Sequence, residues 1–451
     1  MNAQSPAAAP DARRYAVPLL VAFAALHAAM FAYDRLHPDR FLNADRAQER
    51  IGAVRGFAQA WHDGGMVPYL ASHGIPGDWL PQALAYMAGG PSLVIAMQIV
   101  LVLLSILAVQ RLGYAVGLGS RAAAAGAALY GLLPHTLVFP HQLASEAIFD
   151  PLVILSFAAA LGARSGLALG AATLVRPITI PWPILHAGVM PAPRRAKIAY
   201  LACALAPLLL WMSFILAATG ELSMGRSSHD LGHNLYGRMQ RISDSLPEAE
   251  RAPRRPPGHT TAGVGEYLAF VAHHPVAAAK HSVRDVVTLT AKSGVERLTL
   301  DYLDLFPDAR NAIQDSDAGW RVQLEKHGIK AAALQLYSEQ PGLVIVSAVA
   351  AVLFLVFMGL ALTGAWAWLR GPHGARTRDD PGRALRLLMM GFAAYIFLTA
   401  QVVDAAQSRH RAPAEFALCV LAVAGWVGLR RRAERTIGDG RMAGGLSRTA
   451  A

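Results

Sequence analysis

Residues Pro341–Leu369 read PGLVIVSAVAAVLFLVFMGLALTGAWAWL, an apolar stretch without a single charged side chain. A helix of about 20 apolar residues is long enough to cross the hydrocarbon core of a bilayer. Two further stretches, Pro91–Gln110 and Ile198–Gly220, are of similar length and also carry no charge. Surface helices of soluble proteins have a polar face, which these stretches lack. The sequence therefore predicts an integral membrane protein.

The composition of the whole chain agrees with a membrane location. Of its 451 residues, 54% are hydrophobic and 16% are charged, whereas a soluble domain carries about 25% charged residues. A net charge of +11 is also typical of nucleic-acid-binding proteins, but the sequence has no basic tract with interleaved aromatics and no groove-reading motif. We therefore exclude nucleic acid as a partner and assign the basic residues to loops that set the membrane topology.

The apolar stretches predict about ten spans. They lie at residues 15–33, 92–110, 121–138, 147–163, 165–175, 177–190, 197–218, 343–369, 385–403 and 412–430. The short pair around Arg176-Pro177 forms either two broken half-spans or a re-entrant hairpin. The first stretch is either an uncleaved span or a signal sequence cleaved after Ala32.

The basic residues predict the orientation of these spans. With a cytoplasmic N-terminus, all the short basic loops fall on one side, as the positive-inside rule requires. These loops contain Arg13/Arg14, Arg111/Arg121, Arg164, Arg194/Arg195/Lys197, Arg370–Arg386 and Arg430–Arg435. Both termini are then cytoplasmic, and the segments Asp34–Gly90 and 219–342 are extracytoplasmic.

This topology divides the chain into four parts. They are an N-terminal transmembrane module with the first extracytoplasmic loop (1–218), an extracytoplasmic loop region (219–342), C-terminal transmembrane helices (343–430) and a cytoplasmic tail expected to be disordered (431–451). Within the loop region, the sequence predicts a helical stretch from Val264 to Lys292, interrupted at His273-His274-Pro275.

An interfacial helix is expected in the first extracytoplasmic loop, from Ala44 to Trp61, with Asn43 as its N-cap. Its predicted apolar stripe consists of Ile51, Val54, Ala58 and Trp61. Arg50 and Arg55 then lie on other faces, a pattern that suits a helix lying flat at the level of the lipid headgroups.

Ionisable residues beside predicted spans are candidates for function, because burying them in a bilayer is costly. The candidates are Asp45 with its neighbours Arg46 and Glu49, then Glu146, Arg176 and the cluster Arg409–Arg411. By the predicted topology, Asp45, Glu146 and the arginine cluster reach the extracytoplasmic face. Cations at such a place can hold a lipid phosphate, while a carboxylate orients or deprotonates an attacking hydroxyl or amine.

Each candidate also has a purely structural interpretation. Asp45 and Glu146 lie where helices are expected to begin, and the helix dipole favours carboxylates there. Arg409 and Arg411 could anchor the chain at lipid headgroups, and Arg176 could extend its side chain to the interface. The sequence leaves both interpretations open.

No cofactor motif is present in the sequence. The two cysteines, Cys203 and Cys419, both lie in apolar spans, which excludes a disulfide framework and a thiolate metal site. The histidines lack metal-ligand spacing, so no metal site is predicted and a divalent ion has no support. Neither a Walker A sequence nor GxGxxG occurs, so dependence on ATP or NAD is unsupported.

Five short motifs follow one another along most of the chain. They are Asn43-Ala44-Asp45 ahead of a helix ending in Trp61-His62-Asp63-Gly64-Gly65, Ala144-Ser145-Glu146-Ala147, Gly170-Ala171-Ala172-Thr173-Leu174-Val175-Arg176-Pro177, His233-Asn234-Leu235-Tyr236-Gly237 and Ser408-Arg409-His410-Arg411-Ala412-Pro413. In this order they resemble the motifs of the GT-C superfamily of polyprenyl-phosphate-sugar-dependent glycosyltransferases. That group includes aminoarabinose transferases and protein O-mannosyltransferases of the glycosyltransferase family 39 type.

The resemblance implies an all-α polytopic membrane protein with a GT-C-like transmembrane bundle. Its implied activity is transfer of a sugar from an undecaprenyl-phosphate type donor to a lipid or glycan acceptor, at the periplasmic face of a bacterial inner membrane. Asp45 would be the catalytic carboxylate and Glu146 a second acidic group. Arg409 and Arg411, together with Arg176, would bind the donor phosphate. The accessory candidates are Arg46, Glu49, His410, Asn234 and Tyr236.

The chain departs from the family pattern at two positions. Many relatives carry a second acid directly after the catalytic Asp, where this chain has Arg46, and His410 replaces the usual Tyr. The first departure weakens the case for a metal ion bridged by an acidic pair and leaves Glu49 as a substitute.

Two other functions remain open at this point. A lipid-linked sugar flippase or other transporter would require paired repeats and broken helices in matching positions, and only the Arg176 region offers such a break. A polysaccharide polymerase or ligase would also use a basic extracytoplasmic cavity.

Overall fold

The computed structural model describes residues 10–43, 47–224, 226–252, 254–256, 261–306, 334, 337–338, 340–370, 380–400 and 408–446, and all the regular elements in these ranges are helical. Six helices are long and apolar enough to cross a membrane, or up to seven if one bent pair counts as a span. The six lie in α1 (Pro10–Leu36), α4 (Leu80–Ala115), α10 (Arg194–Thr219), α16 (Pro341–Arg370), α17 (Pro381–Thr399) and α18 (Glu415–Leu446). The protein is thus a helical, multi-pass membrane protein.

The bent pair consists of α5 (Ser120–Gly131) and the segment Pro134–His141, which meet at 64°. That segment contains α6 (Pro134–Val138) and the short helix η3 (Phe139–His141). The predicted single span over 121–138 is therefore broken, because Pro134 lacks the N–H that would continue the helix of α5.

Three predicted spans correspond to helices shorter than a bilayer crossing. They are α7 (Glu146–Ala158), α8 (Ala163–Val175) and α9 (Trp182–Val189). α7 is buried along most of its length, and α8 packs along α10. The total of about ten spans stays a prediction, as does the division of the chain into four parts.

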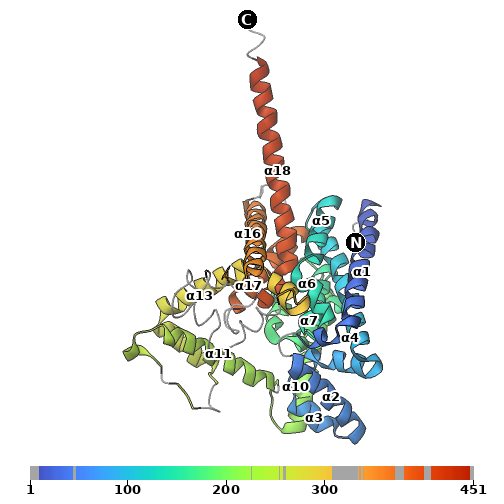
Figure 1. The fold of residues 1–451 in the computed structure, drawn as a ribbon, viewed down its shortest axis with the longest axis vertical. Coiled ribbons are helices and arrows are strands. Elements are labelled where there is room, and N and C mark those ends of the chain that lie inside the picture. The colour runs from blue at the N-terminus through green and yellow to red at the C-terminus, as the bar shows by residue number, and fades with distance from the viewer. Residues whose placement is uncertain are drawn as a thin grey trace.

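Two glycines allow α16 and α18 to pack closely. A Cβ atom at Gly364 would overlap the backbone of Leu421, and one at Gly425 would overlap the backbone of Leu360. Small residues at such a contact let two helices approach until their backbones touch, which is how membrane helices gain packing energy without a hydrophobic driving force. Figure 1 shows the two helices side by side.

The segment predicted as the first extracytoplasmic loop contains α2 (Ala47–Asp63), α3 (Met66–Ser72) and η2 (Pro76–Asp78). Figure 1 shows α2 and α3 at the end of the molecule opposite the C-terminal half of α18. The described part of α2 begins at Ala47, and the predicted start of the helix at Ala44 lies outside the described residues, so Asn43 as its N-cap stays a prediction. The side-chain amide of Asn43 donates to the carbonyl of Asp301 at 3.0 Å.

The buried face of α2 differs from the predicted stripe. Ile51 and Val54 are buried as expected, but Phe57 is buried in place of Ala58, and Trp61 is 60% exposed. Arg50, which was expected to point elsewhere, is buried. The face that meets α4 is therefore rotated toward Arg50, whose guanidinium pairs with the partly exposed Asp78 of η2.

The region 219–342 contains α11 (Arg226–Asp244), α12 (Val264–His273), α13 (Pro275–Ala291) and the π-helix η6 (Arg297–Tyr302). The predicted interruption at His273-His274-Pro275 is confirmed, since α12 ends at His273 and α13 begins at Pro275. In Figure 1, α11 and α13 extend to one side of the helical bundle.

Residues 431–451 were predicted to form a disordered cytoplasmic tail, and the described helix α18 covers residues 431–446 of that stretch. α18 continues to Leu446 and projects beyond the bundle as one helix. No proline interrupts residues 415–446, and Arg430 Nε lies 2.9 Å from Glu434 Oε1 one turn later. Such i, i+4 pairs favour continuation of a helix.

Candidate functional site

Glu146 opens α7 inside the bundle and is only 3% exposed. Its carboxylate forms an ion pair with Arg176, which also donates from Nη2 to Ser145 Oγ at 2.9 Å. Arg50 Nη2 donates to the same hydroxyl at 3.1 Å. The Arg50 guanidinium is in turn paired with Asp78, with Nε 3.2 Å from Oδ1. We call Arg50, Asp78, Ser145, Glu146 and Arg176 the Glu146 cluster.

Ser145 links the Arg50–Asp78 pair to the Arg176–Glu146 pair. Its hydroxyl accepts from Arg50 and Arg176 and donates to Glu146 Oε2 at 3.2 Å. A hydroxyl has one donor and two acceptor positions, so all three are occupied. Hydrogen bonds to charged groups are stronger than neutral ones, and Ser145 therefore helps to hold both arginines beside the carboxylate.

The local sequence explains how Arg176 reaches the carboxylate. Proline disfavours helical geometry in the residue before it, and Arg176 precedes Pro177. Its backbone is extended, with φ −143° and ψ 117°, so α8 ends at Val175. The Arg176 side chain therefore points away from the axis of α8, and its guanidinium contacts Ser145 and Glu146 at the start of α7.

Gly77 positions the other side of the cluster. A Cβ atom there would overlap the backbone at the end of α8, at Leu174 and at Val175 N, 2.6 Å away. Glycine is needed because η2 lies directly on the end of α8. This close approach places Asp78 beside Arg50.

Arg409 lies in the short helix η8 (Ser408–His410) and is half-buried. Its charge stabilises the Glu146 carboxylate together with the charges of Arg176 and Arg50. The structure thus brings together three of the predicted site residues, Glu146, Arg176 and Arg409, although they are far apart in the sequence.

Asp150 adds a second buried acid one turn after Glu146, and its side chain is 7% exposed. It interacts electrostatically with Arg176 and Glu146. Its Oδ1 has no hydrogen-bond partner among the residues that the structure describes. A carboxyl group in such surroundings has capacity to accept a hydrogen bond from a bound molecule.

Arg411 is placed differently from Arg409. It is fully buried, and its donors reach Glu415 at 3.1 Å, the carbonyl of Lys292 at 2.7 Å and the carbonyl of Leu289. Its guanidinium also lies 4.0 Å from the centre of the Phe354 ring. Arg411 therefore ties the start of α18 to α13 and α16, and its role in phosphate binding stays a prediction.

The other predicted site residues lie outside the Glu146 cluster. Glu49 is exposed on α2 and His410 is half-buried in η8. Asn234 and Tyr236 lie on α11, where the Tyr236 hydroxyl accepts from the backbone N–H of Arg255 at 2.8 Å. Asp45 and Arg46 lie outside the described residues.

The residues on both sides of Asp45 contact the site. The backbone N–H of Leu143 donates to the carbonyl of Phe41 at 2.9 Å. On the other side of Asp45, Arg50 donates to Ser145. The first loop is therefore attached to the segment before α7 at two places.

A second polar group, the His141 cluster, lies beside α1 and was not predicted. His141 Nδ1 is 2.6 Å from Asp34 Oδ2, and His141 Nε2 is 2.9 Å from His27 Nδ1. The Tyr302 hydroxyl donates to Asp34 Oδ1 at 2.8 Å. Burial and the Asp34 carboxylate raise the pKa of Tyr302, so this hydroxyl keeps its proton.

Arg50 and Asp78 were also missed as site residues. A signal for Arg50 existed, since it lies three and four residues from Ala47 and Val54 and so shares their buried helix face. Asp78 gave no comparable signal, because it follows Pro76-Gly77 in a loop where charged residues are common.

Within the described part of the chain, no group of three or more His, Cys, Asp or Glu side chains could hold a metal ion. The fold and the site define a helical membrane protein with a buried, arginine-rich charge cluster at the start of α7. No family model, curated protein or solved structure matches the chain.

Proposed function

We propose that this protein is a membrane glycosyltransferase that moves a sugar from a polyprenyl phosphate to a lipid or glycan acceptor. The proposed site faces the periplasm of a bacterial inner membrane, with both termini in the cytoplasm. The observation that carries the proposal is the buried Glu146 carboxylate, which pairs with Arg176 and lies within electrostatic range of Arg50 and Arg409. Phe41 and Arg50, which precede and follow Asp45 in the sequence, contact Leu143 and Ser145 directly before Glu146.

The proposed reaction uses these groups in separate roles. An acceptor hydroxyl or amine attacks the anomeric carbon, and the bond from that carbon to the phosphate oxygen breaks. The electron pair of the broken bond leaves with the polyprenyl phosphate, whose negative charge Arg409 stabilises. The proton of the acceptor passes to Asp45, acting as general base.

In this proposal, Glu146 is a positioning residue. Its carboxylate is already committed to Arg176 and Ser145, and it holds the arginines in the orientation that receives the donor phosphate. Asp150, with one oxygen that has no hydrogen-bond partner in the described part of the chain, is in this proposal the acid that binds a sugar hydroxyl.

The test is transfer of radiolabel from purified polyprenyl-phosphate sugars to extracted lipid and glycan acceptors. Loss of a general base costs about 10²- to 10⁴-fold in rate, so Asp45→Asn should lose transfer to that extent. Asp63→Asn, an exposed residue at the end of α2, is the matched control and should retain it.

Unchanged transfer in a folded Asp45→Asn protein would remove that residue from the mechanism. If no donor supports transfer while the protein moves labelled lipid across vesicles without ATP, the protein is a transporter and the glycosyltransferase proposal fails.

A further inference from the structure

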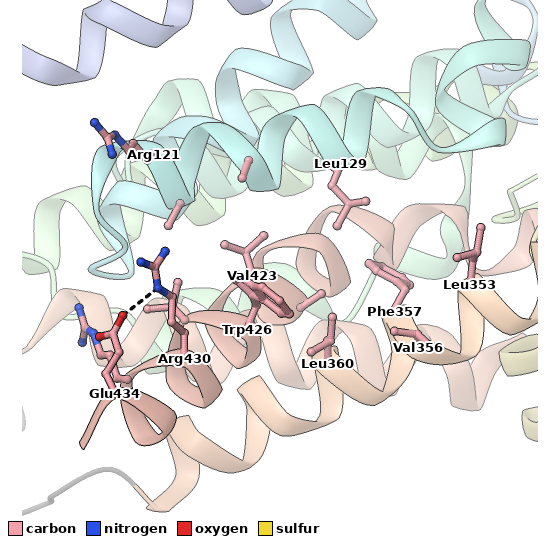
Figure 2. Close-up of a pocket in the computed structure, with 15 residues that line it drawn as sticks. Arg121, Leu129, Leu353, Val356, Phe357, Leu360, Val423, Trp426, Arg430 and Glu434 are labelled. Atoms are coloured by element: carbon pink, nitrogen blue, oxygen red, sulfur yellow. Dashed lines mark hydrogen bonds and ion pairs between the residues drawn. The ribbon is translucent and has the colours of Figure 1, made fainter. Parts of the chain in front are cut away.

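A groove with a cavity volume of about 730 Å³ lies on the outside of the bundle, between α5, α16 and α18. Its walls are apolar side chains such as Leu129, Phe357, Leu360 and Val423. Figure 2 shows Arg121, Arg430 and Glu434 together at one end of the groove and Leu353 at the other. The groove therefore has a charged mouth and an apolar channel.

The charge at the mouth is positive. Arg121, Arg430 and Arg431 line it together with one acid, Glu434, which is paired with Arg430. Three guanidinium groups and one carboxylate leave a net of two positive charges. Arg121 and Arg430 come from different helices, so the mouth combines charges from α5 and α18.

The channel opens toward the lipid-facing surface. Leu353, Val356 and Trp426 line it, and their exposed fractions are 65%, 57% and 60%. In a bilayer, such side chains contact hydrocarbon. By the positive-inside rule, the arginine mouth lies at the cytoplasmic leaflet, where anionic headgroups gather.

We propose that this groove binds an anionic phospholipid of the cytoplasmic leaflet. The guanidinium groups at the mouth hold the lipid phosphate, which planar arginine side chains recognise well. One acyl chain lies along the wall formed by α16 and α18. This site is separate from the Glu146 cluster, which lies against α2 and η2, and does not depend on the proposed activity.

The position of the mouth favours a phospholipid over the polyprenyl-phosphate donor as the occupant. The donor of the proposed reaction would be held at the Glu146 cluster, on the other side of the membrane from these arginines. Basic pockets between membrane helices on the cytoplasmic side bind anionic headgroups in general. Figure 1 shows the C-terminal half of α18 at the opposite end of the molecule from α2 and α3.

The experiment measures lipid retention by the full chain in a neutral detergent, using native mass spectrometry. The probes are phosphatidylglycerol and phosphatidylcholine with the same acyl chains. Because each basic residue contributes about 1 kcal/mol of attraction to an anionic lipid, phosphatidylglycerol should bind at least about tenfold more tightly. The combined variant Arg121→Gln/Arg430→Gln/Arg431→Gln should lose that preference.

A matched control removes three other arginines. Arg164, Arg194 and Arg195 are exposed and predicted on the same side of the membrane, outside the groove. Replacing all three with glutamine changes the net charge equally and should leave phosphatidylglycerol binding within about twofold of the parent protein.

A second variant tests the channel without a change in charge. Ala125 is exposed and lines the groove, so Ala125→Phe fills the channel and should reduce retention of both lipids. Equal binding of the two lipids by the parent protein would overturn the proposal. So would full retention by both variants, or displacement of phosphatidylglycerol by equimolar polyprenyl phosphate.

Discussion

Ser145 uses every hydrogen-bonding position of its hydroxyl group, and all of its partners carry charge. A buried ion pair gains little by itself, since desolvation offsets most of the attraction. Removal of one member is different, because the remaining charge is then buried without a partner. The Glu146 cluster should therefore be sensitive to single substitutions.

Glu146→Gln should lower the free energy of unfolding by about 3 kcal/mol, because it removes the buried carboxylate that forms the ion pair with Arg176. The control is Glu434→Gln, which removes an exposed pair with Arg430 and should cost less than about 1 kcal/mol. Thermal unfolding of the purified protein in detergent measures both. Equal shifts in the two variants would show that the Glu146 pair is no stronger than a surface pair.

Substitutions of Arg411 and Arg409 should have different effects, the first on stability and the second on sugar transfer. Arg411 donates to two backbone carbonyls and to Glu415. Arg411→Lys cannot satisfy all of these groups, and we expect a loss of about 2 kcal/mol of stability. Arg409→Lys should keep the unfolding temperature and lower sugar transfer.

Thermal unfolding and the transfer assay, run on both variants, check this expectation. A normal unfolding temperature with abolished transfer in Arg411→Lys would instead place Arg411 at the donor phosphate.

At the scale of elements, the site depends on how helices end and how closely they approach. α8 ends at Val175 because Pro177 forces Arg176 out of helical geometry, and η2 rests on that end because residue 77 has no side chain. These two features join α2, α7 and α8 at one point.

Gly77→Ala tests this contact. The added methyl group would overlap the backbone of Leu174, and overpacking of this kind costs about 1 to 3 kcal/mol. Gly52 on α2 has open space around it, so Gly52→Ala should stabilise the protein by about 0.5 to 1 kcal/mol. Opposite shifts in unfolding temperature are expected, and a stabilising Gly77→Ala would contradict the close contact.

At the scale of the whole molecule, the orientation in the membrane is open to a direct test. In a chain with Cys203 and Cys419 replaced by alanine, Ser72→Cys should react with a membrane-impermeant maleimide in intact spheroplasts. Arg195→Cys should react only after permeabilisation, because the positive-inside rule places it in the cytoplasm. Both positions are exposed. The reverse pattern would invert the predicted topology.

The sequence predicted part of the fold and part of the site. The long apolar helices, the break at Arg176-Pro177 and the break at His273-His274-Pro275 followed from local patterns. The bend between α5 and α6 did not follow from them. For the site, Glu146, Arg176 and Arg409 meet, whereas Arg50 and the His141 cluster were missed.

There is a physical reason why some features were predicted from the sequence and others were not. Whether a segment can cross a bilayer depends on its length and on its charge, and both are properties of neighbouring residues. That is why Pro341–Leu369 is sufficient to predict a membrane protein. Which charges pair inside the bundle depends on contacts such as Arg50 with Ser145, which are 95 residues apart. Only the tertiary structure decides such contacts, because the backbone approach that permits them is set by how η2, α7 and α8 pack together.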